Sequence, residues 1–330
     1  MSQARTAFQH HLYEETLLHC QTALQAVHLR PDSEAALRCL MAEALECLAR
    51  FTEAAQTLAM YEPEQKRNAL SPLLQSQVCL RLGSAHGGTT EIPKAVAYAK
   101  QALALAMRQN DATTTGRSHL VLGTLYRRLG ELWFARDHFT KIIKESLRYT
   151  DRSLLAQAYN GLGIASFLAG EFAAARQMFG QAIEALGTTD DPLMRGSVDV
   201  NLATIATLQG QMRESVALFE SALPQLQRAR HPRLIVNAHS NLGYSLLRLG
   251  EMNRAEAVLQ DSLVQASACE ALLIEASTLE TLGELHFLQG NFAEAETLLA
   301  KSLTLLKEIR AGFNHPDYTR ASAATPERIR

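Results

Sequence analysis

Few residues of this sequence have the types and spacing that chemistry requires. Glu280 and Glu284 lie four residues apart, so on a helix both carboxylates would share one face and could hold a cation. Two carboxylates alone make a poor metal site, and a basic partner is the better interpretation of the pair. The adjacent residues His10 and His11 have no cysteine or further histidine at metal-ligand spacing. We therefore expect no metal site.

The motifs that mark the common classes of enzyme are missing. The sequence has no GxxxxGK[ST] loop for a nucleotide, no HExxH for zinc and no GxSxG for a nucleophilic serine. Gly161-Leu162-Gly163 lies within a helical pattern and follows no strand, so it indicates close helix packing rather than a dinucleotide site. We expect no catalytic residues, no cofactor and no enzymatic activity.

Length and composition favour an all-helical array. With 330 residues the chain exceeds the roughly 250–300 residues at which one core stops growing, so two domains or an elongated repeat are the candidates. Ala, Leu, Gln, Glu and Arg dominate, and these residues form helices well. Alternating runs of Val, Ile and Thr are missing, so no strand is predicted.

The sequence also bears on the compartment. No apolar run approaches the roughly 20 residues of a membrane helix, and the first residues lack the apolar segment of a secretory signal. The cysteines are scattered singly, which favours small buried side chains and reduced thiols; they are Cys20, Cys39, Cys47, Cys79 and Cys269. We expect a cytoplasmic protein without a membrane partner.

A period of 40 residues runs along most of the chain. A turn glycine recurs at positions 130, 170, 210, 250 and 290, and leucine recurs at 122, 162, 202, 242 and 282. With some loss of fidelity the period extends toward the N-terminus and gives eight units, the first lacking most of its leading helix. The unit centres are small residues within the second helix, namely Thr16, Ala54, Ala95, Ala135, Ala175, Ser215, Ala255 and Ala295.

Each unit is predicted to be a helix hairpin. Leu122, Leu125 and Leu129 form the stripe of an amphipathic helix, and Gly130 permits the left-handed conformation that ends it. Glu131 follows in the first turn of the second helix, and a small residue in the middle of that helix allows close approach. One hairpin cannot bury its apolar face, whereas stacked hairpins can.

The segment YNGLGIASFLAGEFAAARQMFGQAIEAL (159–186) resembles the tetratricopeptide repeat, with its Leu-Gly pair, turn glycine and small residue in the second helix. The resemblance covers about residues 3–308, and the 40-residue period resembles the longer variant of kinesin light chains and of bacterial regulator sensor regions. It implies a right-handed α-solenoid of about eight antiparallel helix hairpins over residues 1–310. The turn at residues 86–93, HGGTTEIP, departs from the pattern.

The resemblance also implies that the first helix of each hairpin lines a concave groove. The groove positions form four rows, which begin at Arg117, Leu120, Thr124 and Arg127 and repeat every 40 residues. Apolar members of these rows are anchors for a ligand or parts of the inter-repeat core, and core is the preferred interpretation for Phe167 and Phe287. The candidate binding residues in the rows are Arg117, Arg127, Asn160, Ile164, Phe167, Tyr244, Leu247, Glu280, Glu284 and Phe287.

Members of the family that bind extended peptides often place an asparagine just before the Leu-Gly pair, where its amide clamps the ligand backbone. Asn201 and Asn241 occupy that position in consecutive repeats. The alternative is that both are solvated or helix-capping side chains. The basic residues of a chaperone-binding carboxylate clamp are missing beside them, so recognition of chaperone C-termini is not expected.

Charge is distributed unevenly although the formal net charge is only −2. Residues 81–152 hold 12 Lys/Arg against 6 Asp/Glu, and residues 153–300 hold 8 against 16. One hypothesis is an elongated partner with its acidic end toward Arg117 and Arg127 and its basic end toward Glu280 and Glu284. The alternatives are a solvated face and head-to-tail self-association. The basic excess of a nucleic-acid-binding domain is missing, so no nucleic-acid partner is expected.

These observations predict a non-enzymatic scaffold that binds a peptide or a segment of a protein in its groove. The alternative functions are a sensory segment of a bacterial multidomain signalling protein, such as a transcription regulator or a diguanylate cyclase, and a self-associating solenoid. Residues 311–330 are interpreted as a tail that caps the last hairpin or links it to another domain.

Overall fold

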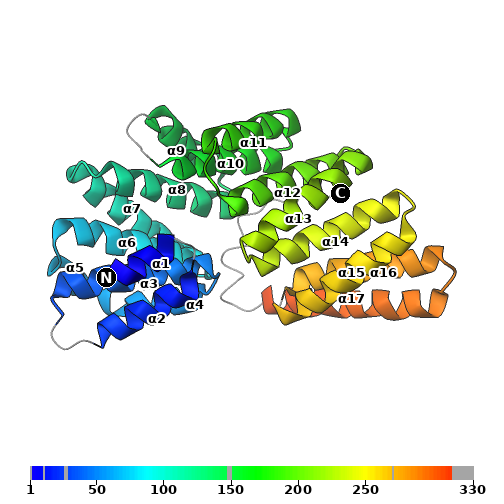
Figure 1. Cartoon of the computed structure of the whole chain (residues 1–330), viewed down its shortest axis with the longest axis horizontal. Helices are drawn as coiled ribbons and strands as arrows, with labels where there is room; N and C mark the ends of the chain where they lie inside the picture. The colour runs from blue at the N-terminus through cyan, green and yellow to red at the C-terminus, as the bar shows by residue number, and fades with distance from the viewer. Residues whose placement is uncertain (1, 10–11, 26–28, 147–150, 270, 314–330) are drawn as a thin grey trace. The chain divides into compact units, whose positions relative to one another are not determined.

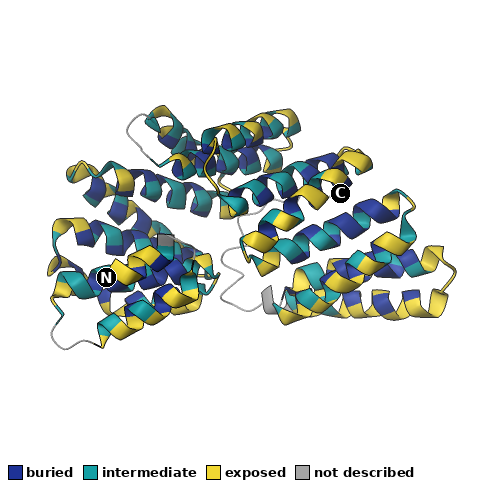
Figure 2. Cartoon of the chain, in the orientation of Figure 1, coloured by how far each residue is buried: buried dark blue, intermediate teal, exposed yellow. Residues whose placement is uncertain are grey.

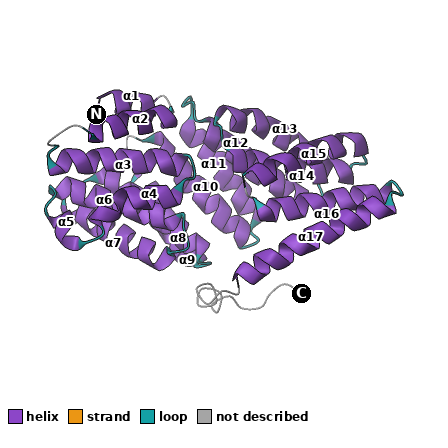
Figure 3. Cartoon of the chain, turned by 90° about the horizontal axis from the view of Figure 1, so that it is seen from below, coloured by secondary structure: helices purple, strands orange, loops and turns teal. Residues whose placement is uncertain are grey.

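Helices form all of the regular structure in the part of the chain that the computed structural model describes, which comprises residues 2–9, 12–25, 29–146, 151–269 and 271–313 (Figure 3). The all-α prediction and the prediction of consecutive hairpins in a solenoid are confirmed. The helices, paired in chain order, are α1 (Ser2–Gln9) and α2 (Tyr13–Leu24), α3 (Pro31–Cys47) and α4 (Phe51–Leu58), α6 (Pro72–Gly87) and α7 (Ile92–Arg108), α8 (Ala112–Arg128) and α9 (Leu132–Lys144), α10 (Arg152–Leu168) and α11 (Phe172–Leu186), α12 (Pro192–Leu208) and α13 (Met212–Arg228), α14 (Pro232–Arg248) and α15 (Met252–Ala268), and α16 (Leu272–Leu288) and α17 (Phe292–Phe313). The 3₁₀ helix η1 (Ala59–Tyr61) and the short helix α5 (Glu64–Asn68) connect α4 to α6.

The chain divides into two compact units, which are described separately (Figure 1). Unit 1 comprises residues 1–171 and 184–186, and unit 2 comprises residues 172–183 and 187–330, so α11 contributes to both. In unit 1, α6 packs against α7 and α8 packs against α9. In unit 2, α12 packs against α13 and α14 packs against α15.

The first helices begin at capping residues that recur with the period. Asp111, Asp151 and Asp191 each accept a hydrogen bond from a backbone N–H in the first turn of the helix that follows, and His231 takes the same place before α14. Such caps satisfy N–H groups that have no partner inside the helix. In α12 and α14 the residue after the cap is proline, as the sequence predicts.

The turn glycines have the left-handed conformation that was predicted. Gly130, Gly170, Gly210, Gly250 and Gly290 have φ between 74° and 83°. Ala49 holds the equivalent place after α3 with φ 59°. The residue after each glycine, such as Glu131, lies just before the second helix and not in its first turn, because α9 begins at Leu132.

The small residue in the second helix of each hairpin is buried where two helices meet. Each of the eight is the fourth residue of its second helix, so it lies in the first turn rather than in the middle. All eight are at most 2% exposed. The glycine of the Leu-Gly pair, in the first helix of the hairpin, is packed tightly against the second helix. A Cβ atom at Gly123 would come within 2.6 Å of the ring of Phe139, and one at Gly243 would come within 2.4 Å of Leu259. Close helix approach therefore needs both positions to be small.

Each unit has its own hydrophobic core (Figure 2). The large residue four positions after the small one is fully buried at Phe139, Phe179, Phe219 and Leu259, and Leu299 in the last hairpin is 42% exposed. This difference follows from stacking, because α13 packs against α14 and α15 against α16, and α17 is the last described helix.

The unusual turn at residues 86–93 is built around two glycines. α6 continues through Gly87 and Gly88 follows as its cap with a negative φ, so this turn does not use the left-handed residue of the other repeats. A Cβ atom at Gly88 would come within 2.0 Å of the ring of Phe51, and one at Gly87 within 2.8 Å of Leu125. The side chains that pack here explain why the sequence departs from the repeat.

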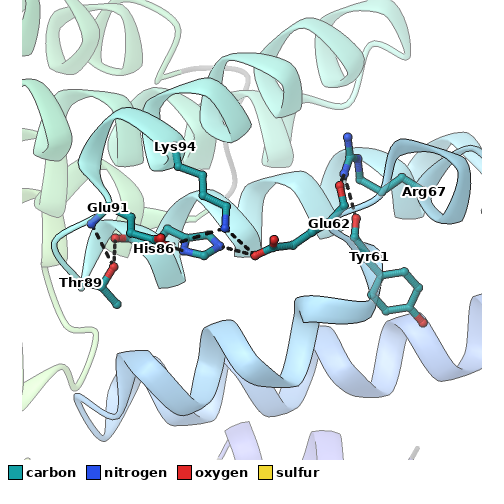
Figure 4. A network of polar contacts seen from close by, with 7 residues as sticks. All are labelled: Tyr61, Glu62, Arg67, His86, Thr89, Glu91 and Lys94. Atoms are coloured by element: carbon teal, nitrogen blue, oxygen red, sulfur yellow. Dashed lines mark hydrogen bonds and ion pairs between the residues drawn. The ribbon is translucent and has the colours of Figure 1, made fainter.

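A polar network closes the same turn (Figure 4). His86 is buried, with Nε2 at 2.9 Å from Oε1 of Glu62 and Nδ1 at 2.7 Å from Oε2 of Glu91. Nζ of Lys94 lies 2.8 Å from the same Glu62 oxygen, and it is this hydrogen bond together with the one to His86 that lowers the pKa of Glu62. The network fixes the segment between α4 and α6 onto the start of α7.

No helix in the described ranges is both long and apolar enough to span a bilayer. His10, His11 and residues 314–330, most of the proposed tail, lie outside the described residues.

Candidate functional site

Three pockets follow one another along the first helices of unit 1. They have volumes of about 190, 230 and 170 Å³ and are lined by residues of α3, α6, α8 and α10, with Arg5 of α1 at one end and Phe139 of α9 at the other. The first and second pockets share Arg81 and Arg117, and the second and third share Leu120 and Gln157. Because neighbouring pockets share walls, we treat them as one surface, the unit 1 groove.

Two arginines of the groove are held by carboxylates. Nη2 of Arg81 lies 2.6 Å from Oε1 of Glu43, and its Nη1 lies 3.3 Å from Oε2 of Glu46. Arg117 extends the chain, with Nη1 at 3.1 Å from Glu43 and Nη2 at 3.8 Å from Asp151. Arg117 is a predicted binding residue, and its charge is already balanced within the chain.

Burial sets the protonation behaviour of this cluster. Burial raises the pKa of Glu46, although Arg81 and a hydrogen bond from Ser84 act in the opposite direction. Burial alone would lower the pKa of Arg81, but the carboxylates of Glu43 and Glu46 outweigh this effect. The net result is a raised pKa, so the guanidinium stays charged. Oε1 of Glu46 is buried without a hydrogen-bond partner among the described residues, and Glu46 lines the second pocket.

The third pocket brings together three predicted binding residues, Arg127, Asn160 and Ile164. Half of its lining residues are apolar or lack a side chain, namely Leu120, Phe139, Gly161 and Ile164, and half are polar, namely Thr124, Arg127, Gln157 and Asn160. Nε of Arg127 is buried without a hydrogen-bond partner. We call this the Arg127 pocket. Phe167, also predicted, is half-buried in α10.

In unit 2 the asparagine pair lies on α12 and α14. Both Asn201 and Asn241 are half-buried. Nδ2 of Asn241 donates to the backbone oxygen of Asn237 at 2.9 Å and to its Oδ1 at 2.6 Å. A backbone clamp at Asn241 would therefore require these hydrogen bonds to be exchanged for bonds to the ligand.

Two further predicted residues of unit 2, Tyr244 and Glu284, both contact Arg248. The guanidinium of Arg248 lies over the ring of Tyr244, 4.8 Å from its centroid, and pairs with Glu284 at 2.9 Å. Glu284 thus already has a basic partner, whereas Glu280 is exposed. A basic ligand at Glu280 and Glu284 would therefore have to share Glu284 with Arg248 or displace it.

Two apolar residues of the same row have opposite environments. Leu247 is 4% exposed and belongs to the core of unit 2, so it is not a ligand anchor in this structure. Phe287 is 58% exposed and packs edge to face with Phe292, with ring centroids 5.4 Å apart. The preferred core interpretation of Phe287 is therefore wrong: the residue lies in the last described hairpin, formed by α16 and α17, and its side chain is largely exposed.

The sequence analysis missed Glu43, Glu46 and Arg81. The signal was available, because the four rows continue toward the N-terminus. One period back from Leu120 and Thr124 stand Leu80 and Ser84, and 41 residues further back from Ser84 stands Glu43. All three line the groove, beside Arg81 and Glu46.

Within the described residues, no three His, Cys, Asp or Glu side chains are placed to hold a metal ion. The closest histidine pair is His119 and His138, whose Nδ1 atoms are 2.8 Å apart.

The tetratricopeptide repeat profile matches residues 234–308, and a second profile of the same description matches residues 155–186. No curated protein matches the chain.

Solved structures are similar in fold. A Rap protein in complex with Competence and Sporulation Factor has a TM-score of 0.68 and 12% identity, with 91% of this chain and 81% of that chain covered. The quorum sensor NprR from B. thuringiensis, in its apo form, has a TM-score of 0.60 and 10% identity, with 92% and 97% covered. A signal transduction ATPase with a tetratricopeptide repeat sensor from Pyrococcus horikoshii has a TM-score of 0.61 and 13% identity, with 91% of this chain and 45% of that chain covered.

Proposed function

Because the chain is a tetratricopeptide repeat protein, we propose that it is a scaffold without catalytic activity, which binds an extended peptide or a segment of a protein along the unit 1 groove. The observation that carries this proposal is the run of three contiguous pockets along α3, α6, α8 and α10. Each pocket is smaller than the roughly 300 Å³ at which sites for drug-sized ligands begin. A row of small pockets suits successive side chains of a linear ligand.

The groove offers a peptide both apolar and polar contacts. Leu80 and Leu120 contribute apolar surface, while Gln77 and Gln157 carry amides that can donate to and accept from peptide bonds. The Rap protein of similar fold was solved with Competence and Sporulation Factor bound, which supports the search for a factor that binds this chain.

Panning a library of random linear peptides against the full chain tests the proposal. Enriched peptides should bind Gln157→Arg at least tenfold more weakly than the parent, because the larger charged side chain would stand where two pockets meet. Gln177→Arg makes the same change at an exposed position of α11 and should leave the affinity unchanged. Equal binding to Gln157→Arg and the parent would exclude the groove as the site.

A sensory segment of a signalling protein is the second candidate. The similarity to the ATPase with a repeat sensor favours it, since this chain spans 45% of that protein. A sensor should change its radius of gyration in solution scattering when an enriched peptide is added, and a rigid scaffold should not.

A further inference from the structure

Arg127 differs from Arg81, Arg117 and Arg136 of unit 1 in having no anionic partner among the described residues. Arg81 and Arg117 are paired with carboxylates of the groove. Arg136 pairs with Glu171 at 2.6 Å, and Arg128 donates to a backbone oxygen. Arg127 makes no ion pair with any described residue, although its Nε is buried. A guanidinium cannot shed its proton in a protein, so the charge remains and lacks a counterpart.

The unpaired charge faces a cavity. Arg127 lines the third pocket, which has a volume of about 170 Å³, together with apolar residues that include Phe139 and Ile164. Phe139, one of these lining residues, is 1% exposed. A pocket whose lining combines aliphatic side chains with one cation fits a ligand that carries an aliphatic group close to an anion.

Keeping a partly buried charge without a partner costs stability. Burial, and then the neighbouring Arg128, lower the pKa of Arg127, which means that its surroundings disfavour the charged form. The equivalent positions in later repeats are Phe167, Thr207, Leu247 and Phe287, so the repeat does not need an arginine here. A charge that the fold does not need, at the wall of a cavity, is best explained by a ligand that balances it.

We propose that the Arg127 pocket is a subsite for a carboxylate that is carried beside an aliphatic side chain. The guanidinium would donate to the carboxylate oxygens, while Leu120 and Ile164 would contact the aliphatic group. Gln157 and Asn160 carry amides at the same wall and suit the adjoining peptide bond. The carboxylate comes either from the C-terminus of a peptide or from an Asp or Glu side chain. The identity of the ligand as a peptide rests on the function proposed above, whereas the preference for a carboxylate does not.

Small probes test the subsite without any peptide from the library. Saturation-transfer NMR is recorded on the full chain with N-acetyl-leucine, with N-acetyl-leucine amide, and with N-acetyl-leucyl-aspartate α-amide, whose side-chain carboxylate is left free. The free carboxylate of the first probe is terminal and that of the third is on a side chain. At least one of the two should bind about tenfold more tightly than the neutral amide, and the tighter of them identifies the source of the carboxylate. Equal signals for all three probes would overturn the proposal.

Variants at position 127 assign the effect to the guanidinium. Arg127→Gln should lose the preference for the carboxylate, and Arg127→Lys should keep part of it, since a lysine offers a charge without the planar fork. Arg176→Gln is the matched control, because Arg176 lies in unit 2 and is paired with Glu214. A preference that survives in Arg127→Gln would sink the assignment.

The stability of the free protein gives an independent readout. Arg127→Gln should melt at the same temperature as the parent or higher, and the preferred probe should raise the melting temperature of the parent only. A lower melting temperature for Arg127→Gln, without loss of probe binding, would make Arg127 a structural residue. If the probes bind as expected but no library peptide is enriched, the peptide-binding proposal fails and the carboxylate subsite stands.

Discussion

The ring of Phe139 lies so close to Gly161 that a Cβ atom at position 161 would come within 2.6 Å of ring carbon Cε1. The same ring meets Gly123 from the other side, again at 2.6 Å. α8 and α10 thus both approach α9 over one buried phenylalanine, which also lines the Arg127 pocket. The glycines of the repeat therefore shape the candidate site as well as the stacking.

Gly161→Ala should destabilise unit 1 by about 1–3 kcal/mol, because the added methyl group must displace the ring or the helix. Gly180→Ala, also within a helix, is the matched control. Nothing lies within 4 Å of a Cβ atom there, so the change should stabilise α11 by up to about 1 kcal/mol. Urea denaturation of both variants measures the difference. Similar effects of the two changes would contradict the close contact at Gly161.

At the left-handed turn positions, replacing glycine by alanine should destabilise the protein, and replacing alanine by glycine should stabilise it. Gly250→Ala should cost about 1 kcal/mol, because φ is 81° there and no neighbour clashes with the new methyl group. Ala49→Gly should stabilise the protein by a similar amount, since Ala49 has φ 59° at an exposed turn. Thermal unfolding of the two variants checks the prediction, and shifts of the same sign would refute it.

Arg81 should be one of the most sensitive positions of unit 1. Arg81→Met leaves Glu43 and Glu46 without their shared cation in a largely buried cluster, a loss that typically costs about 3–5 kcal/mol. Arg81→Lys should cost less, because it keeps the charge but cannot reach both carboxylates equally. Arg213→Met, at an exposed position, should change the free energy of unfolding by less than about 0.5 kcal/mol. A loss for Arg81→Met as small as that would mean that the carboxylates find other partners.

The histidine pair of His119, which is buried, and His138, which is half-buried, predicts that acid weakens the fold. Burial, then the proximity of His119, lowers the pKa of His138 to about 4, and burial, then Lys141, lowers the pKa of His119. The unfolded chain, with ordinary histidine pKa values near 6.5, binds more protons than the folded chain below that pH. The contribution of the pair is therefore complete above pH 6.5 and is lost progressively as the pH falls toward 4.

Urea denaturation at pH 7.5, 6.0 and 5.0 measures this dependence. The variant His119→Gln/His138→Gln cannot titrate at these positions, so its stability should fall less steeply with acid than that of the parent. Its pH dependence need not vanish, because burial also lowers the pKa of His231 and of His239. Parallel curves for the variant and the parent would show that the pair does not titrate in this range.

How far the sequence predicts the structure depends on how local each cause is. The left-handed glycine at position 130 and the buried alanine at position 135 follow from the 40-residue period, because a φ sign and a contact between consecutive helices involve residues close in sequence. The position of Glu131 was misjudged by one residue, since helix boundaries depend on which backbone groups pair. Arg127, Asn160 and Ile164 were predicted one by one, and the structure places them at a single pocket.

The sequence by itself determined the repeat, the hairpins, the turn glycines and the rows of the first helices, because each recurs at a fixed spacing and has a local physical cause. Only the tertiary structure decided which members of a row remain open to a ligand. Arg117 is neutralised by Glu43, 74 residues away in the sequence, whereas Arg127 has no such partner in the part of the chain that the structure describes. Leu247 is buried and Phe287 is exposed although the two occupy the same repeat position. Burial and charge pairing are properties of neighbours brought together by stacking, and a periodic pattern does not encode which neighbours a given copy meets.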